Sequence, residues 1–230
     1  MNKVIVINGS PRKDKGNTGL LLKPFIEGMV EAGADVEVCY ASEMKVEPCS
    51  CSRMYCWNDE PGVCCIKDKM QELYPRLAAT SILILATPMY IPFPGDMQNM
   101  VNRLCPLIDP VLAFRSGRTR AKLRAPISIR KLALVATSGW WEKDNLETLT
   151  RIAREMAAHM DIEFSGAIIR SHAFYMRENG VVTSNGQAVL EAAKQAGHAL
   201  AEKGRIPKEL IDAISRPLVS AERWIHDQSE

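Results

Sequence analysis

Residues 4–18 read VIVINGSPRKDKGNT and contain the pattern that decides the fold. Four aliphatic residues, at 4–7, indicate a strand that is buried on both faces. A turn rich in glycine, serine and asparagine follows, and a helix-like segment begins at Thr18. A strand that passes through such a turn into a helix is the building unit of an open parallel α/β sheet. The free N–H groups at the start of that helix favour an anion beyond the end of the strand.

The rest of the chain repeats the alternation of strand and helix. Apolar runs predict further strands at residues 36–40, 82–86, 132–136 and 167–169. Helix-like stretches are found at residues 18–32, 68–79, 96–104, 146–159 and 187–203. Five strands alternating with helices predict an α/β fold of the flavodoxin-like type, a doubly wound five-stranded parallel sheet of order 2-1-3-4-5. Ligands of such sheets bind beyond the carboxyl ends of the strands.

Three segments fall outside this minimal pattern. We expect residues 1–205 to form the main domain, with a cysteine-rich loop at 48–65. Residues 109–131 hold seven basic residues and are interpreted as an insertion before strand four. Residues 206–230 are interpreted as a C-terminal extension that begins as a helix and breaks at Pro217.

Composition argues against several classes of protein. Hydrophobic residues make up 47% and charged residues 24% of the 230 residues, as in ordinary globular proteins. The net charge of +2 gives no global field for nucleic acid or a membrane surface, so we expect neither partner. No apolar run approaches the roughly 20 residues of a membrane span, and the first residues lack a signal-peptide pattern. We therefore expect a cytoplasmic protein.

The turn after the first strand has the donors of a phosphate site. Ser10, Asn17 and Thr18 supply neutral hydrogen-bond donors, and Arg12 supplies a charged one. Gly16 lets the backbone approach a ligand closely. The turn has neither the Walker A pattern nor the dinucleotide pattern G-x-G-x-x-G, so a phosphate monoester such as that of FMN fits better. The alternative is a polar turn that only caps the helix.

Three loops together resemble those of NADPH-dependent FMN reductases and iron–sulfur flavoproteins. The first is the turn at 9–18, the second is TPMY at 87–90 with PGDM at 94–97, and the third is TSGWW at 137–141. The resemblance implies FMN as the cofactor and a homodimer or homotetramer. It also implies a cofactor-binding set of Ser10, Arg12, Gly16, Asn17, Thr18, Pro88, Met89, Tyr90, Ile91, Thr137, Ser138, Gly139 and Trp140.

The sequence shows no nucleophile–base pair and no paired carboxylates with an evident acid–base role. We therefore expect no catalytic protein residue, because flavin N5 would itself carry the hydride. Met89, Tyr90, Trp140 and Trp141 are suited to wall a planar ring. The alternative for Trp140 and Trp141 is a packed pair beneath the basic insertion. His172, just past the fifth strand, is the one histidine expected near this site.

Five of the seven cysteines fall within seventeen residues. They are Cys49, Cys51, Cys56, Cys64 and Cys65. Thiols this dense on a loop usually bind a metal or take part in redox chemistry. An iron–sulfur cluster, structural zinc and free thiols are the three alternatives. Cys39 lies on a predicted strand and Cys105 at a helix end, where both are interpreted as packing residues.

Cys56-Trp57 and the segment CCIKDKM at 64–70 resemble the C-x2-C-x2-C-x5-C motif of iron–sulfur flavoproteins. The resemblance implies a [4Fe–4S] cluster at the end of the sheet where the flavin lies. The spacing before Cys56 departs from that motif. The predicted ligands are Cys49, Cys51, Cys56 and Cys64, with Cys65 as a substitute.

The predicted function is that of an FMN-dependent oxidoreductase or electron-transfer protein of the iron–sulfur flavoprotein type. One alternative is an NAD(P)H-dependent FMN or quinone reductase without a cluster. Another is a non-enzymatic electron carrier or a zinc-stabilised binding module. The donor is expected to be NAD(P)H or a protein, and the acceptor a small molecule or a protein. The arginines of the insertion, such as Arg118, suit an anionic reductant such as NADPH. The alternatives are a solvated loop and a subunit contact.

Overall fold

A five-stranded parallel sheet forms the centre of the protein in a computed structural model that describes residues 2–51 and 53–229. Its strand order is β2-β1-β3-β6-β7, so β6 and β7 are the fourth and fifth strands of the predicted flavodoxin-like sheet. The strands are β1 (Lys3–Asn8), β2 (Asp35–Tyr40), β3 (Ile82–Pro88), β6 (Lys131–Thr137) and β7 (Glu163–Arg170). Each predicted strand lies within one of these.

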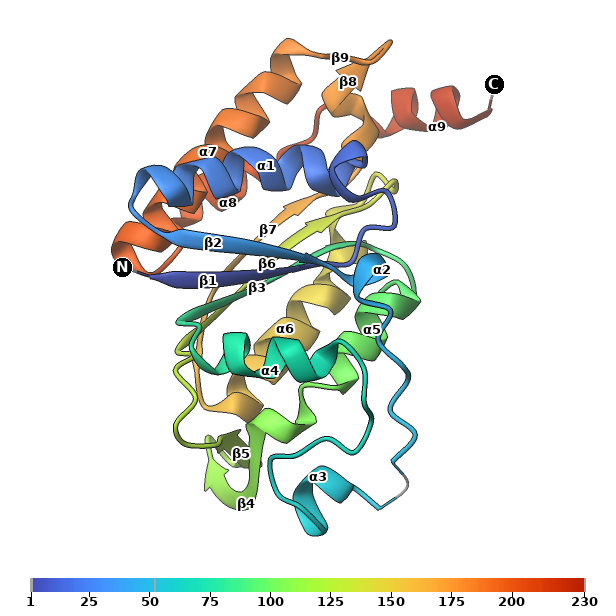
Figure 1. Cartoon of the computed structure of the whole chain (residues 1–230). Coiled ribbons are helices and arrows are strands. Elements are labelled where there is room, and N and C mark those ends of the chain that lie inside the picture. Colours follow the sequence, from blue (N-terminus) through green and yellow to red (C-terminus); the bar gives the residue numbers. More distant parts are fainter. Residues whose placement is uncertain (1, 52, 230) are drawn as a thin grey trace.

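Helices cover both faces of the sheet (Figure 1). One layer contains α1 (Asn17–Glu31), α7 (Ser184–Lys203) and α8 (Lys208–Ser215). The other layer contains α4 (Met70–Ala78), α5 (Gly95–Asn102) and α6 (Glu147–Met160). Strand side chains alternate between the two apolar cores, since Ile5 packs into the core with α4 and Val6 into the core with α1. Burial on both faces explains why the strands are nearly continuous aliphatic runs.

Two glycines allow α1 and α7 to cross closely. A Cβ atom on Gly28 would lie 1.9 Å from the Lys194 carbonyl oxygen. A Cβ atom on Gly197 would lie 1.8 Å from the Phe25 carbonyl oxygen. Neither position has room for a side chain, so the two backbones pack directly on each other. This contact fixes the position of α1, whose N-terminus forms part of the candidate site.

The predicted insertion contains a β-hairpin made of β4 (Ile108–Arg115) and β5 (Arg118–Leu123). Its arginines bind the chain's own acids: Arg118 and Arg120 pair with Glu155 on α6 at 3.0 and 2.7 Å. Arg115 pairs with Asp161 at 3.2 Å. These ion pairs fasten the hairpin to α6. Three apolar side chains of β4 are exposed, namely Val111, Leu112 and Phe114.

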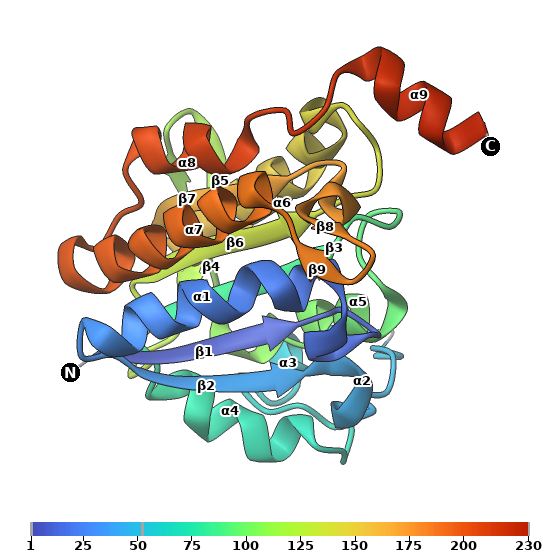
Figure 2. The same cartoon turned by 90° about the horizontal axis from the view of Figure 1, so that it is seen from above.

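The C-terminal extension holds two helices, α8 and α9 (Ala221–Ser229), separated by a break around Pro217. Figure 2 shows α9 projecting beyond the carboxyl ends of the strands. The helical part before Pro217 was expected from the sequence, whereas α9 was not. The alternative of a tryptophan pair packed beneath the basic insertion is not what the structure shows, because Trp141 Nε1 donates to the Val219 carbonyl of the C-terminal extension at 3.0 Å.

Short elements complete the chain. They are α2 (Ala41–Met44), α3 (Tyr55–Asn58), the 3-10 turns η1 (Lys13–Lys15), η2 (Cys105–Leu107), η3 (Lys143–Leu146) and η4 (Ala173–Met176), and the small hairpin β8 (Arg177–Glu178) and β9 (Val181–Val182). Within residues 2–51 and 53–229, none of the helices combines the length and the apolar character that a membrane crossing requires.

Candidate functional site

A cavity of about 360 Å³ lies at the carboxyl ends of β1, β3, β6 and β7. Four loops line it, each directly following one of these strands. The lining residues are Ser10, Pro11, Arg12, Gly16, Asn17, Thr18, Pro88, Met89, Tyr90, Thr137, Ser138, Gly139, Ala173 and Phe174. Eleven of the thirteen residues expected from the sequence are in this set, and its size is that of a small-molecule pocket.

The first wall is the turn between β1 and α1. The buried Asn8 side chain accepts the backbone N–H of Ser10 at 2.9 Å and so shapes the turn. Gly16 is the N-cap of α1, and no side chain of the described residues caps this helix end. The first N–H groups of a fifteen-residue helix are therefore available at the cavity together with their partial positive charge. Such a helix end suits a phosphate group.

The other walls are tied to the first and to each other by hydrogen bonds. The hydroxyls of Thr18 and Thr137 are 2.7 Å apart, which joins α1 to the end of β6. The N–H of Met89 donates to the Thr137 carbonyl at 2.7 Å, and the N–H of Ala173 donates to the Ser138 carbonyl at 2.9 Å. The buried Ser138 hydroxyl has no partner among the described residues. A buried hydroxyl left unpaired at a cavity wall is the kind of group that a polar ligand satisfies.

Two predicted residues do not line the cavity. The side chain of Ile91 is 98% exposed, and Trp140 is 60% exposed. Trp140 instead pairs with Trp224 of α9, with ring centroids 6.3 Å apart. Trp224 Nε1 also donates to the carbonyl of Gly139 at 3.2 Å, so α9 lies directly beside the cavity wall.

Sequence reasoning missed the fourth loop, which contributes Ala173 and Phe174. The only indication of this loop in the sequence was His172, which precedes Ala173 and Phe174 and was expected near this site. His172 is buried and has a φ of 35°, in the left-handed region. Its N–H donates to the Trp140 carbonyl at 2.6 Å. His172 therefore links the third and fourth loops and does not itself line the cavity.

The cysteine-rich loop occupies another part of the molecule. Figure 1 shows α3, which carries Cys56, beyond α4 and beside the β4–β5 hairpin. None of the cysteines lines the cavity at the ends of the strands. The expectation that they lie at the flavin end of the sheet is therefore wrong. The chain leaves the end of β2 there but then runs along the α4–α5 layer to α3 (Figure 1).

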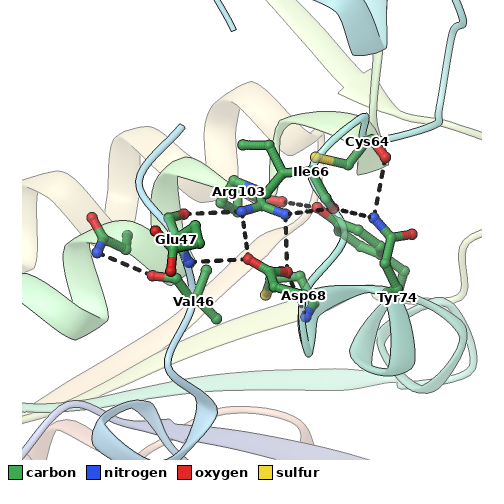
Figure 3. Close-up of polar contacts among 10 residues, drawn as sticks. Val46, Glu47, Cys64, Ile66, Asp68, Tyr74 and Arg103 are labelled. Atoms are coloured by element: carbon green, nitrogen blue, oxygen red, sulfur yellow. Dashed lines mark hydrogen bonds and ion pairs between the residues drawn. The ribbon is translucent and has the colours of Figure 1, made fainter. Parts of the chain in front are cut away.

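The loop is closed at its neck by Arg103, which follows α5 and is fully buried (Figure 3). Its guanidinium pairs with Asp68 at 2.8 and 3.1 Å and donates to the carbonyls of Glu47 at 2.9 Å and Ile66 at 3.3 Å. Glu47 and Ile66 flank the cysteines on either side. Asp68 also accepts the N–H of Glu47 at 3.0 Å. One ion pair thus holds both ends of the loop together.

Each partner of this pair stabilises the charge of the other. Burial raises the pKa of Asp68, but hydrogen bonds from Arg103, Glu47 and Met70 outweigh it, so the pKa of Asp68 falls below its ordinary value. Burial lowers the pKa of Arg103, but Asp68 and the neighbouring Cys64 and Tyr74 raise it above its ordinary value. Both groups are therefore charged at neutral pH.

Cys105, which the sequence assigned to packing, lies among the thiols of the loop. Burial raises the pKa of Cys56 to about 12, and the nearby Cys105 acts in the same direction. Burial also raises the pKa of Cys105, and Cys49, Cys51 and Cys64 act in the same direction. Six of the seven cysteines therefore belong to one region. In the chain outside positions 1, 52 and 230, no three histidine, cysteine or acidic side chains converge as the ligands of a single metal ion.

Comparison with known families agrees with this arrangement. Residues 2–140 match the family described as NADPH-dependent FMN reductase, and this stretch covers more than half of the chain. The chain belongs to this family. The matched residues end at Trp140, so they include the first three cavity loops and the cysteine-rich loop. The fourth loop and the C-terminal extension lie outside the match.

This FMN reductase family member is also similar to iron–sulfur flavoproteins. It is 34% identical over 88 residues to one from Methanocaldococcus jannaschii, a stretch that covers 38% of this chain and 44% of the relative. It is 28% identical over 102 residues to one from Methanosarcina thermophila, covering 44% of this chain and 51% of the relative. The chain thus matches about half the length of these relatives.

Solved structures share the fold of this family member. A putative quinone reductase from Klebsiella pneumoniae superposes with a TM-score of 0.64 at 15% identity, covering 90% of this chain and 86% of that one. An FMN-dependent NADH-azoreductase from Bacillus anthracis, in complex with FMN, gives a TM-score of 0.57 at 14% identity, with coverage of 87% and 100%. At such low identities the likeness establishes the flavodoxin-like architecture alone.

Proposed function

We propose that this protein is an FMN-dependent oxidoreductase of the iron–sulfur flavoprotein type. The observation that carries the proposal is the cavity at the strand ends, which combines an uncapped helix N-terminus with an unpaired buried hydroxyl. A phosphate monoester on the first loop would meet the N–H groups of α1, the hydroxyls of Ser10 and Thr18, and Arg12 at the rim. Family membership supports FMN as the ligand.

The protein's part in the chemistry is to bind and orient. FMN, when bound, supplies hydride and single-electron transfer. Met89 and Tyr90 stand at the cavity with the backbone of the second loop, where they can wall a planar ring. The bond from Met89 N–H to the Thr137 carbonyl keeps the second and third loops in register. None of these roles requires a protein nucleophile.

The phosphate site is tested by replacing Ser10, Arg12 and Thr18 together with alanine. Each charge-assisted or buried hydrogen bond is worth about 1–3 kcal/mol, so FMN binding should weaken by several kcal/mol in a fluorescence titration. Lys15→Ala is the matched control, because Lys15 is a neighbouring cation that does not line the cavity. Equal affinity of the triple variant and the wild type would refute the site.

The proposal includes a [4Fe–4S] cluster on the cysteine-rich loop, with Cys49, Cys51, Cys56 and Cys64 as ligands and Cys65 as a substitute. Of these sulfurs, Cys51 Sγ accepts the backbone N–H of Tyr55 at 2.8 Å. Hydrogen bonds to ligand sulfurs are typical of iron–sulfur sites. The similarity to iron–sulfur flavoproteins supports the same assignment.

Two alternatives predict different colours. An NAD(P)H-dependent FMN or quinone reductase without a cluster would show flavin bands alone. Solved structures that share this fold are named as reductases, which supports this alternative. A zinc-stabilised binding module would be colourless and contain zinc. The visible spectrum of anaerobically purified protein, with metal analysis, separates them. A broad shoulder that bleaches on reduction, beside the flavin bands, supports the cluster.

We further propose NAD(P)H or a protein as the donor, a small molecule or a protein as the acceptor, and a homodimer or homotetramer in the cytoplasm. The exposed Val111, Leu112 and Phe114 of β4 favour self-association through the hairpin. An apolar groove of about 550 Å³ beside the hairpin, lined in part by Ile152 and Met156, offers a complementary surface. Light scattering after size-exclusion chromatography tests this, and Phe114→Ser should shift the protein toward monomer.

A further inference from the structure

We propose that a second cavity, between the fourth loop and α9, binds the adenosine end of NADPH, and that Arg177 recognises the 2′-phosphate of this ligand. The inference deepens the proposed function and rests on it, because it gives the donor of that function a binding site. The second cavity has a volume of about 350 Å³. Its walls come from η4, β8, the start of α7 and the C-terminal extension.

The first observation is that this second cavity adjoins the flavin cavity. Phe174 lines both of them. The β8–β9 hairpin and α9 lie at the end of the molecule where the strands terminate, in both views (Figure 1 and Figure 2). A donor whose nicotinamide ring meets the flavin in the first cavity must place its adenosine end outside that cavity. The second cavity offers this end a place directly beside the first.

The second observation is the unpaired charge of Arg177 in β8. Arg177 is half-buried, and its guanidinium forms no ion pair or hydrogen bond with any residue in 2–51 or 53–229. By contrast, Arg118 and Arg120 of the insertion pair with Glu155, so the arginines expected to suit NADPH are already occupied. A guanidinium presents a planar array of N–H donors that binds two phosphate oxygens at once. A phosphate in the second cavity would satisfy the charge of Arg177.

The other charged groups of this cavity do not cancel that charge. Asp227 accepts the hydroxyl of Tyr175 at 2.7 Å, and its carboxylate pairs with Arg223 at 3.6 Å. Glu178, which also lines the cavity, is exposed. A carboxylate in such a place is suited to accept a ribose hydroxyl, as an acidic residue does in dinucleotide sites. The cavity therefore offers a cation for a phosphate and an acceptor for the sugar.

The third observation is an aromatic pair in the wall of the second cavity. The ring centroids of Phe174 and Tyr175 are 4.7 Å apart, and Phe174 is 36% exposed. An accessible aromatic ring is suited to stack on a purine base. Leu218 and Val219 add apolar contacts on the side of the C-terminal extension. All of these residues lie beyond the stretch 2–140 that matches the family, so the match does not assign this cavity.

The test is isothermal titration calorimetry of the FMN-loaded protein with adenosine 2′,5′-bisphosphate and with 5′-AMP, which lacks only the 2′-phosphate. Wild type should bind the bisphosphate at least about tenfold more tightly, the effect of one charge-assisted contact. Arg177→Gln should remove this difference. Arg205→Gln is the matched control and should keep it, because Arg205 is exposed, follows the far end of α7 and lines neither cavity.

Steady-state kinetics with NADPH and NADH provide a second measurement. Arg177→Gln should raise the KM for NADPH about tenfold, with kcat and the KM for NADH unchanged. An FMN titration checks that this variant is folded, because Arg177 does not line the flavin cavity.

Equal binding of the two adenosine ligands by wild type, or a preference that survives in Arg177→Gln, would overturn the assignment while the FMN site stands. Wild type that binds FMN but is reduced by neither nicotinamide nucleotide would overturn the nicotinamide donor and this site with it. Absence of FMN binding by wild type would overturn the proposed function itself.

Discussion

Two fully buried arginines hold different segments of the chain in place, and they do so in different ways. Arg103 holds the cysteine-rich loop and pairs with the carboxylate of Asp68. Arg170, at the end of β7, holds the C-terminal extension and has no carboxylate partner among the described residues. It donates to the carbonyls of Ser171, Ile214 and Arg216, each at 2.7 Å.

The fourth partner of Arg170 is the imidazole of His172, at 3.1 Å from Nε2. The same Nε2 accepts the N–H of Leu218 at 3.0 Å. Since both neighbours of Nε2 are donors, Nε2 is the unprotonated nitrogen, and Nδ1–H donates to the Trp141 carbonyl at 3.1 Å. Burial and the charge of Arg170 lower the pKa of His172 to about 4. Burial and the nearby Arg216 lower the pKa of Arg170 to about 10, which still leaves it charged at neutral pH.

The comparison shows that one buried guanidinium can be stabilised by a carboxylate and another by neutral acceptors alone, here three carbonyls and an imidazole. In the pair of Arg103 and Asp68, the loss of either partner is costly, because the charge of the other stays buried without a counter-charge. The arrangement around Arg170 leaves no orphan charge when the arginine is lost, because its partners are neutral. The two segments should therefore differ in how they respond to mutation and to pH.

The largest effect is expected for Arg103→Met. It leaves the carboxylate of Asp68 buried without its counter-charge, which costs about 3–5 kcal/mol of unfolding free energy. Urea unfolding followed by circular dichroism measures it. Asp68→Asn combined with Arg103→Met should restore part of the loss, because neither charge then remains. Strictly additive losses in this double-mutant cycle would show that the ion pair is not what holds the neck.

These two anchors also show where sequence reasoning stops. The β1 turn and α1 were predicted because strand, turn and helix start follow each other within residues 4–18. Periodicity also revealed the alternating layers, because each face of a strand must be buried. The clamp of Arg103 on Asp68 joins residues thirty-five apart, and Trp224 meets Gly139 from eighty-five residues away. Residues so far apart in the chain form no local sequence pattern from which these contacts could be predicted.

The same limit explains the errors at the sites. Cys105 stands alone in the sequence, and only the structure shows that its turn, η2, packs on α3 through the hydrogen bond from Trp57 Nε1 to the Cys105 carbonyl. Phe174 was missed because no motif marks the loop after β7. The cysteine-rich loop was expected at the flavin end of the sheet because it begins at the end of β2. The hydrogen bonds from Arg103 to the carbonyls of Glu47 and Ile66 instead hold it against the end of α5.

Arg170→Met should be less damaging than Arg103→Met. The carbonyls of Ile214 and Arg216 lose a charged donor, and water replaces part of this hydrogen bonding. The expected total loss is on the order of 2–3 kcal/mol of unfolding free energy. The extension should also become the first site of cleavage in limited proteolysis, while the cysteine-rich loop keeps its wild-type protection. A loss of stability as large as that of Arg103→Met would contradict the distinction between the two anchors.

Lowering the pH should weaken the contacts of Arg170 and His172 with the C-terminal extension before it weakens the Arg103–Asp68 pair. The pKa of His172 is about 4 in the folded protein and about 6.5 when unfolded, so the unfolded state binds more protons between these values. Stability from this group is fully present above pH 6.5 and is lost as the pH falls toward 4. One pKa unit corresponds to about 1.4 kcal/mol, so the loss should be on the order of 2–3 kcal/mol.

The pKa of Asp68 is lowered by folding, so its contribution is lost only below the ordinary carboxylate range. Hydrogen exchange between pH 7 and pH 4 should therefore show the extension opening while the neck of the cysteine-rich loop stays protected. His172→Asn retains a residue tolerant of the left-handed backbone and removes the titrating group. Its stability should be flatter over this window. An unchanged pH profile in this variant would assign the acid loss to other groups.

The smallest effect on stability, and the most specific one, is expected at Trp224. This side chain of α9 is only half-buried, so Trp224→Ala should cost less than about 1 kcal/mol of unfolding free energy. It does, however, bond to the Gly139 carbonyl and pair with Trp140 beside the cavity. We expect this aromatic pair, which lies beside the cavity, to contribute about 0.5–1.5 kcal/mol to the binding of a planar acceptor. The KM for a quinone should then rise about 2- to 10-fold, with kcat and the KM for ferricyanide unchanged. Trp224→Phe keeps the ring and loses only the indole donor, so it should retain most of the quinone affinity. A uniform change for both acceptors would mean that α9 supports the fold of the third loop and does not select what reaches the flavin.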